Sequence, residues 1–239
     1  MTLLACLAAC ERALAAPHDI KVHSDEMTEE GEHALEVHAN IARPSPDGRR
    51  GHVWQAMPEY TYGFARNWAL SLQLPFSKVG DNYYANGAGA EVLYIAPHDK
   101  ARGAYWGINA ELAYASPIGE RSSWVLELVP IAATRFGKFH FAANLGLEIP
   151  ITGGESKVTF QPAAMLTYAV DSRNELGFEY YSDLGPLKNF APRDEQERTL
   201  YAVWNRKQHS FDLNLGIGRG LTHASDRWVF KAMAEFEVK

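Results

Sequence analysis

The sequence of 239 residues predicts an all-β protein, a 12-stranded antiparallel up-and-down transmembrane β-barrel. Three features support this prediction: apolar and polar residues alternate with a period of two from residue 35 onward, the alternating runs are long, and there are about twelve of them. Runs of about ten residues suit a strand that crosses a bilayer, whereas strands of soluble sandwiches are typically about five or six residues long. An even number of such strands closes into a barrel with both chain ends on one side.

The segment 139–152 shows the alternation most clearly. Its odd-numbered residues from Phe139 to Ile149 are apolar, while its even-numbered residues from His140 to Pro150 are polar or small. Since successive side chains of a strand point to opposite faces, one face of this strand is apolar and suits lipid, and the other suits a polar or water-filled interior.

The expected strands in chain order lie near residues 33–43, 52–63, 68–78, 83–96, 104–116, 122–136, 139–152, 157–170, 175–186, 198–206, 209–220 and 227–239. Their connections alternate in length. The tight ones, at 65–67, 137–138, 171–174 and 206–208, are typical of periplasmic turns, while the opposite end carries longer loops such as 44–51 and 187–197.

Aromatic residues gather near the ends of the expected strands. Such clustering predicts two belts at the lipid–water boundaries, because aromatic side chains favour that depth. The residues concerned are Trp54, Tyr62, Trp68, Tyr94, Trp106, Trp124, Phe139, Tyr168, Trp204 and Trp228.

Charge and hydropathy exclude other classes. The formal net charge of −6 and the lack of a basic run argue against a nucleic-acid partner. No run of about 18 apolar residues occurs, so no transmembrane helix is expected. The mean hydropathy of −0.27 is compatible with a membrane barrel, whose strands face lipid with only every second residue.

The N-terminal part divides into two expected segments. Residues 1–16 resemble a signal peptide with a truncated start, since a short apolar stretch precedes the A-x-A pattern at 13–15. Both cysteines fall here, and Cys10 could alternatively be lipidated. Residues 17–32 are predicted to form a flexible periplasmic segment, and residues 33–239 the outer-membrane β-barrel.

Several hairpins repeat one pattern, for example Pro58-Glu59-Tyr60-Thr61-Tyr62-Gly63 leading through a short turn to Leu70-Ser71-Leu72-Gln73-Leu74-Pro75-Phe76. In this pattern the chain, from about residue 33 to its end, resembles the outer-membrane transporters grouped with the MetA pathway of phenol degradation. The resemblance implies a barrel in the outer membrane of a Gram-negative-type bacterium that passes small molecules. Its partners would be the lipid bilayer and the barrel-assembly machinery.

Most expected strands carry an acidic residue on their polar face. If that face lines the lumen, the interior potential is negative and favours cations. The alternative is a structural role, in which these carboxylates pair with Arg135, Lys231 and polar neighbours and fill a narrow barrel. The expected lumen-lining residues are Glu36, Glu59, Glu91, Glu111, Glu127, Glu148, Glu179, Asp212 and Glu235.

Two further patterns carry little chemistry. His18, His23, His33 and His38 lie among acidic residues, but no pair has the spacing of a zinc finger or an HExxH motif, so no metal site and no cofactor are predicted. The H-x-S spacing at His223-Ala224-Ser225 occurs in outer-membrane lipid hydrolases, where histidine activates serine. Here it falls in an expected external loop, and we predict no catalytic residues.

The function that these patterns favour is a passive outer-membrane channel or transporter for small solutes, cationic or aromatic. The alternatives are an outer-membrane lipid hydrolase that uses His223 and Ser225 and a soluble ligand-binding β-barrel. The sequence does not specify the solute.

Overall fold

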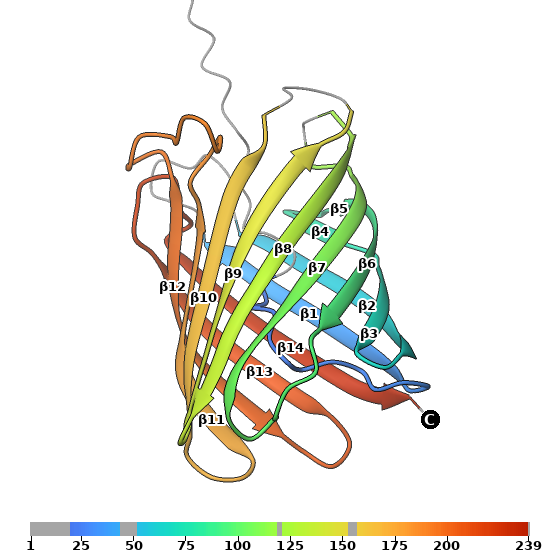
Figure 1. Ribbon diagram of the computed structural model, residues 1–239. Coiled ribbons are helices and arrows are strands. Elements are labelled where there is room, and N and C mark those ends of the chain that lie inside the picture. The colour runs from blue at the N-terminus through green and yellow to red at the C-terminus, as the bar shows by residue number, and fades with distance from the viewer. Residues whose placement is uncertain (1–19, 44–51, 119–120, 153–156, 239) are drawn as a thin grey trace, which may run out of the picture.

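The strands form one continuous antiparallel sheet that closes on itself, because β1 pairs with both β2 and β14 (Figure 1). The computed structural model describes residues 20–43, 52–118, 121–152 and 157–238. The strands in this part of the chain are β1 (His33–Arg43), β2 (Val53–Ala65), β3 (Trp68–Gln73), β4 (Phe76–Val79), β5 (Asn82–Ala85), β6 (Gly87–Ile95), β7 (Gly103–Ala115), β8 (Ser123–Phe136), β9 (Phe139–Pro150), β10 (Thr159–Ala169), β11 (Asn174–Asp183), β12 (Glu197–Lys207), β13 (Asp212–Gly220) and β14 (Trp228–Val238).

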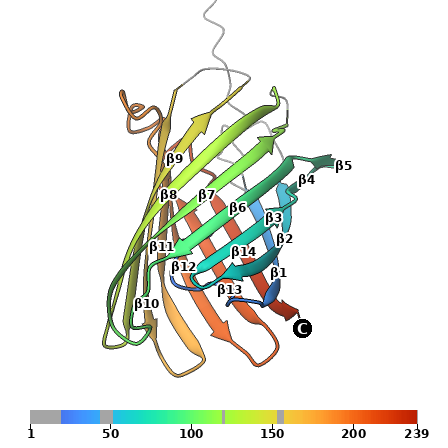
Figure 2. The ribbon, with the colours of Figure 1, turned by 45° about the vertical axis from the view of Figure 1, so that its right-hand side comes forward.

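Two of the predicted strands are each divided in two. β3 and β4 both pair with β2, and the division falls at Leu74-Pro75, where proline has no N–H to donate to the ladder. β5 pairs with β4 alone, whereas β6 returns to β3, so β4 and β5 form a hairpin that leans away from the barrel (Figure 2). Counted around the circumference the wall has 12 strands, and the predicted fold class is confirmed.

The predicted inward and outward faces are also confirmed on the strands that define them. On β9 the side chains of Phe141 and Leu145 are exposed on the outside, while those of His140 and Asn144 are buried inside. A soluble protein does not expose so much contiguous apolar surface, so this outer face fits lipid.

Aromatic rings contact one another around the outside near the strand ends. Trp68 contacts Tyr94 with ring centroids 4.6 Å apart, Tyr94 contacts Trp106 at 5.6 Å, and Phe139 contacts Tyr168 at 5.1 Å. These residues lie at the end of the barrel that carries the tight turns, which we call the turn end. Trp124 is exposed near the opposite end, which we call the loop end. This arrangement is typical of membrane aromatic belts.

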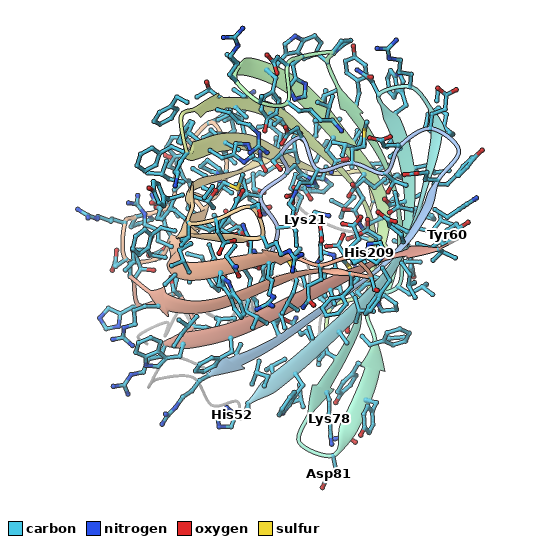
Figure 3. The ribbon with its side chains drawn as sticks, turned by 90° about the horizontal axis from the view of Figure 1, so that it is seen from below. Lys21, His52, Tyr60, Lys78, Asp81 and His209 are labelled. Carbon is cyan, nitrogen blue, oxygen red and sulfur yellow. The ribbon has the colours of Figure 1, made fainter. Side chains whose placement is uncertain are left out.

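Residues 20–25, here called the lumen segment, run inside the barrel, whereas Glu26 and residues 29–32 are exposed. In Figure 1 the dark-blue chain before β1 starts inside the ring of strands and leaves it near the end of β14, and in Figure 3 Lys21 lies near the centre of the ring. The prediction of a solvated periplasmic segment at 17–32 is wrong for residues 20–25, since all of them except the half-buried Lys21 are buried. The reason is that polar and acidic side chains in this segment meet polar partners on the inner wall. The predicted signal peptide at 1–16 lies outside the described residues.

The lumen segment completes two apolar clusters inside the barrel. Val22 packs in a cluster with Ile95, Tyr105 and Ile131, and Ile20 packs in a second cluster with Tyr201. No helix among the described residues is long and apolar enough to cross a membrane.

Candidate functional site in the barrel lumen

Asp25 anchors the lumen segment to the inner wall near the turn end. Arg135 of β8 donates to both carboxylate oxygens of Asp25, with distances of 2.7 and 3.2 Å. His98 and Tyr105 each lie 3.2 Å from the same carboxylate. Burial alone would raise the pKa of Asp25, which lies outside the strands, but the hydrogen bonds and charge of Arg135 outweigh burial and hold that pKa below its usual range.

Two further contacts hold the middle and the beginning of the lumen segment. The backbone N–H of His23 donates to Asn144 Oδ1 at 2.7 Å, and Asn144 Nδ2 donates back to the carbonyl of His23 at 2.9 Å. Lys231 of β14 donates to the carbonyl of Ile20 at 2.7 Å and also to the carboxylate of Glu179. These contacts reach β8, β9 and β14, so the segment bridges different sides of the wall.

Two cavities lie toward opposite ends of the barrel. The larger, of about 440 Å³, extends from Ile20, Lys21 and His23 toward the loop end. The smaller, of about 390 Å³, adjoins Asp25, Met27 and the β6–β7 connection at the turn end. The lumen segment contributes to the lining of both and lies on the path between them.

The larger cavity is acidic. Its described lining includes one lysine, Lys21, and six carboxylates: Glu111, Glu127, Glu148, Asp183, Glu197 and Asp226. Three of these, Glu111, Glu127 and Glu148, are among the residues that the sequence predicted to line the lumen.

The strand register arranges eight of the nine predicted carboxylates in two ladders. Directly opposed residues across β6 to β9 give the ladder Glu91–Glu111–Glu127–Glu148, and those across β2, β1, β14 and β13 give the ladder Glu59–Glu36–Glu235–Asp212. Directly opposed residues point to the same face with Cβ atoms about 4.5–5.5 Å apart. The structure therefore places all eight on the inner face.

The ninth, Glu179, forms the buried ion pair with Lys231. This pairing agrees with the structural alternative for that residue. Arg135, the other expected partner of the nine, instead binds Asp25 of the lumen segment, which the sequence interpretation had placed outside the barrel.

The second ladder contains a compact group of Glu36, His38 and Glu59. Their ligand-type atoms all lie within 4.8 Å of one another, and all three residues are buried. Lys21 donates to Glu36 Oε2 at 2.7 Å, and Thr61 donates to Glu59 Oε1 at 3.1 Å. Sequence reasoning missed this group because Glu59 joins it only through the β1–β2 register. The alternation along 33–43, which puts Glu36 and His38 on the same face, was the one sequence feature that pointed to part of this group.

The H-x-S pattern is not a catalytic pair. Ser225 is buried, and its hydroxyl accepts from the backbone N–H of Arg198 at 2.7 Å and donates to the carbonyl of Arg198 at 2.8 Å. His223 is exposed, and in the described part of the chain no hydrogen bond joins it to Ser225. Ser225 thus fixes the loop against β12.

Comparisons with known proteins bear on the fold. No family model matches the chain, and no curated protein matches it. Among solved structures, a KdgM porin in complex with disordered oligogalacturonate is 9% identical with a TM-score of 0.60, covering 86% of this chain and 99% of that one. A NanC porin is 10% identical with a TM-score of 0.60, covering 85% of this chain and 100% of that one.

The chain has the fold of an outer-membrane porin. Porins are β-barrels of the Gram-negative outer membrane, which is the location that the sequence predicted. At this level of identity the likeness concerns the fold alone, and the resemblance to the MetA-pathway transporters stays a prediction.

Proposed function

We propose that the protein is a passive outer-membrane channel for small cationic solutes. The observation that carries the proposal is the lining of the larger cavity, with six carboxylates and one lysine among its described residues. Fields of one sign are focused by low-dielectric walls, so such a cavity concentrates cations and repels anions.

The carboxylate ladders strengthen this argument. Like charges directly opposed across strands destabilise a sheet, and a mobile cation that passes along the ladder relieves that repulsion. The ladder Glu91–Glu111–Glu127–Glu148 leads from the middle of the barrel into the larger cavity, so it offers successive sites rather than one tight one. Several weak sites favour permeation over retention.

Aromatic rings in the same cavity support an organic cation. Tyr114, Tyr181 and Tyr201 contribute to its lining. The ammonium of Lys231 lies 5.5 Å from the ring of Tyr181 and 5.6 Å from that of Tyr201, so both rings already face a cation.

The solute class does not follow from the fold. The KdgM porin was solved with oligogalacturonate, which is a chain of uronic acids and carries negative charge. An acidic cavity disfavours such a polyanion, so we assign this chain a different solute class on the strength of its charges.

The lumen segment limits the size and rate of what passes. Any solute that crosses from the larger to the smaller cavity must pass residues 20–25, which are tied to the wall by Asp25, His23 and the carbonyl of Ile20. We therefore expect small unitary conductance in the wild-type protein.

Planar-bilayer recording in a salt gradient tests the proposal. A reversal potential that indicates cation preference is expected, and Glu111→Gln with Glu127→Gln should reduce that preference. A matched control is Asp194→Asn with Glu195→Gln, which removes two exposed charges from the loop end without touching the cavity lining. Anion preference, or no current even when Asp25 is replaced by alanine, would contradict the channel.

A further inference from the structure

Three side chains on the inner wall converge as metal ligands do. Glu36 and Glu59 are directly opposed across β1 and β2, and His38 follows Glu36 on the same face of β1. His38 Nε2 lies 3.3 Å from Glu36 Oε1 and 3.7 Å from Glu59 Oε2. Two ligand atoms of a tetrahedral Zn²⁺ site, each about 2.1 Å from the ion, are about 3.4 Å apart. Both distances from His38 Nε2 are close to that value.

The other carboxylate oxygens are held by neighbours. Lys21 donates to Glu36 Oε2, and Thr61 donates to Glu59 Oε1, so each carboxylate presents its remaining oxygen toward His38. The amide Nε2 of Gln73 donates to Glu59 Oε2 at 3.3 Å, so it fixes the position of the oxygen that faces His38. Outer groups that orient carboxylate and imidazole ligands in this way are a regular part of metal sites.

Burial and access complete the case. The side chains of Glu36, His38 and Glu59 are 7%, 2% and 5% exposed. Two carboxylates this close and this buried require positive charge nearby. Lys21 and Met57, which is the cross-strand partner of His38, line the larger cavity, so the group lies one side chain behind that lining and an ion would enter from this cavity.

We propose that Glu36, His38 and Glu59 form a binding site for a divalent transition-metal ion in the wall of the lumen. The ligand set of one imidazole and two carboxylates suits Zn²⁺ or Co²⁺ better than Mg²⁺ or Ca²⁺, which take oxygen ligands. Three protein ligands leave a fourth position open to water or to a solute in the lumen.

Co²⁺ alone is a suitable probe, since tetrahedral Co²⁺ gives strong visible absorption, and Zn²⁺ can be titrated by calorimetry. The full-length folded protein in detergent should bind one ion. His38→Gln and Glu59→Gln should each weaken binding about tenfold or more, since even changes to outer groups of a metal site cost about 10–100-fold.

Glu91→Gln is the matched control for Glu59→Gln. Glu91 is equally buried and also accepts a hydrogen bond from Gln73, at 3.0 Å, but it is outside the group. Its replacement should leave the affinity nearly unchanged. Unheated gel migration checks that each variant is folded, and His38→Cys, which supplies a thiolate, should keep binding and shift the Co²⁺ spectrum.

Four outcomes would overturn the site. The wild type could give neither Co²⁺ absorption nor Zn²⁺ binding heat, or Glu91→Gln could weaken binding as much as Glu59→Gln does. The other two are full binding in His38→Gln and loss of binding in His38→Cys while the barrel remains folded. Absence of both metal signals in the wild type would mean that His38 serves only as an ionic partner of Glu36 and Glu59. The measurement does not depend on conductance, so failure of the site and failure of the channel are distinguishable.

Discussion

Arg135 and Asp25 are separated by 110 positions in the sequence, yet Arg135 Nη2 lies 2.7 Å from Asp25 Oδ1 inside the barrel. Arg135 belongs to the wall and Asp25 to the lumen segment, so this pair is one of the three ties that hold residues 20–25 inside. Because the Asp25 side chain is only 3% exposed, loss of either partner leaves a charge with little access to water.

Asp25→Ala should release the end of the lumen segment and increase conductance. It should also lower stability, because Arg135 loses a bidentate partner. The double variant Asp25→Ala with Arg135→Ala should lose less stability than the sum of the single changes, with a coupling of about 0.5–3 kcal/mol. Single-channel recording and denaturant unfolding in detergent check these expectations, and additive losses with unchanged conductance would show that the pair does not hold the segment.

Lys231→Met should be one of the more damaging single changes inside the barrel. It removes the ammonium that binds Glu179 and the carbonyl of Ile20 and leaves Glu179 buried without this partner. Breaking a buried pair typically costs about 3–5 kcal/mol. Adding Glu179→Gln should restore part of that loss in an unfolding titration, whereas a further loss in the double variant would speak against an ion pair.

Leu145→Arg should impair membrane insertion far more than Gln161→Arg. Leu145 is exposed on the outer face of β9, and a charge there costs about 2–4 kcal/mol near the bilayer midplane. Gln161 lies on the inner face of β10, where its amide is within 3.5 Å of carboxylate oxygens of Glu148 and Asp183, so an arginine finds partners. Folding into liposomes measures the difference, and equal yields would contradict the assignment of faces.

Ser225→Ala should lower thermal stability without removing any activity. The hydroxyl accepts from the backbone N–H of Arg198, so alanine leaves that half-buried N–H without its partner at a cost of about 1–3 kcal/mol, whereas the carbonyl of Arg198 keeps the bond from the N–H of Leu221. His223→Ala is the matched control, since His223 is exposed, and it should leave the melting temperature unchanged. Cleavage of phospholipid or lipid A that depends on Ser225 would overturn the prediction that His223 and Ser225 have no catalytic role.

Much of the barrel could be predicted because the alternation of apolar and polar residues that marks a strand is contained in the strand's own sequence. The bounds predicted for β1, 33–43, are those that the structure has, and the alternation on β9 gave the correct inner and outer faces. The division of β3 from β4 was missed, although Pro75 stood in the expected strand, because the alternation continues across it.

The arrangement inside the lumen could not be predicted in the same way. The placement of the lumen segment depends on contacts such as that of His23 with Asn144, 121 positions away, and nothing in residues 20–32 has a period that points to an inner wall. The group of Glu36, His38 and Glu59 depends on the pairing of β1 with β2, and register is a property of two strands rather than of either one.

The hydrogen bond from Lys231 to the carbonyl of Ile20 can form only once β14 is in place. Its partners are 211 positions apart, and Lys231 lies on β14, the strand that completes the seam with β1. Without β14 the barrel wall is not closed, and the ammonium of Lys231 that donates to the carbonyl of Ile20 is not in place. Pairing of β14 with β1 supplies both at once. Before β14 pairs with β1 the sheet has an open seam, so we expect residues 20–25 to enter the interior laterally through that seam rather than by threading through a closed ring.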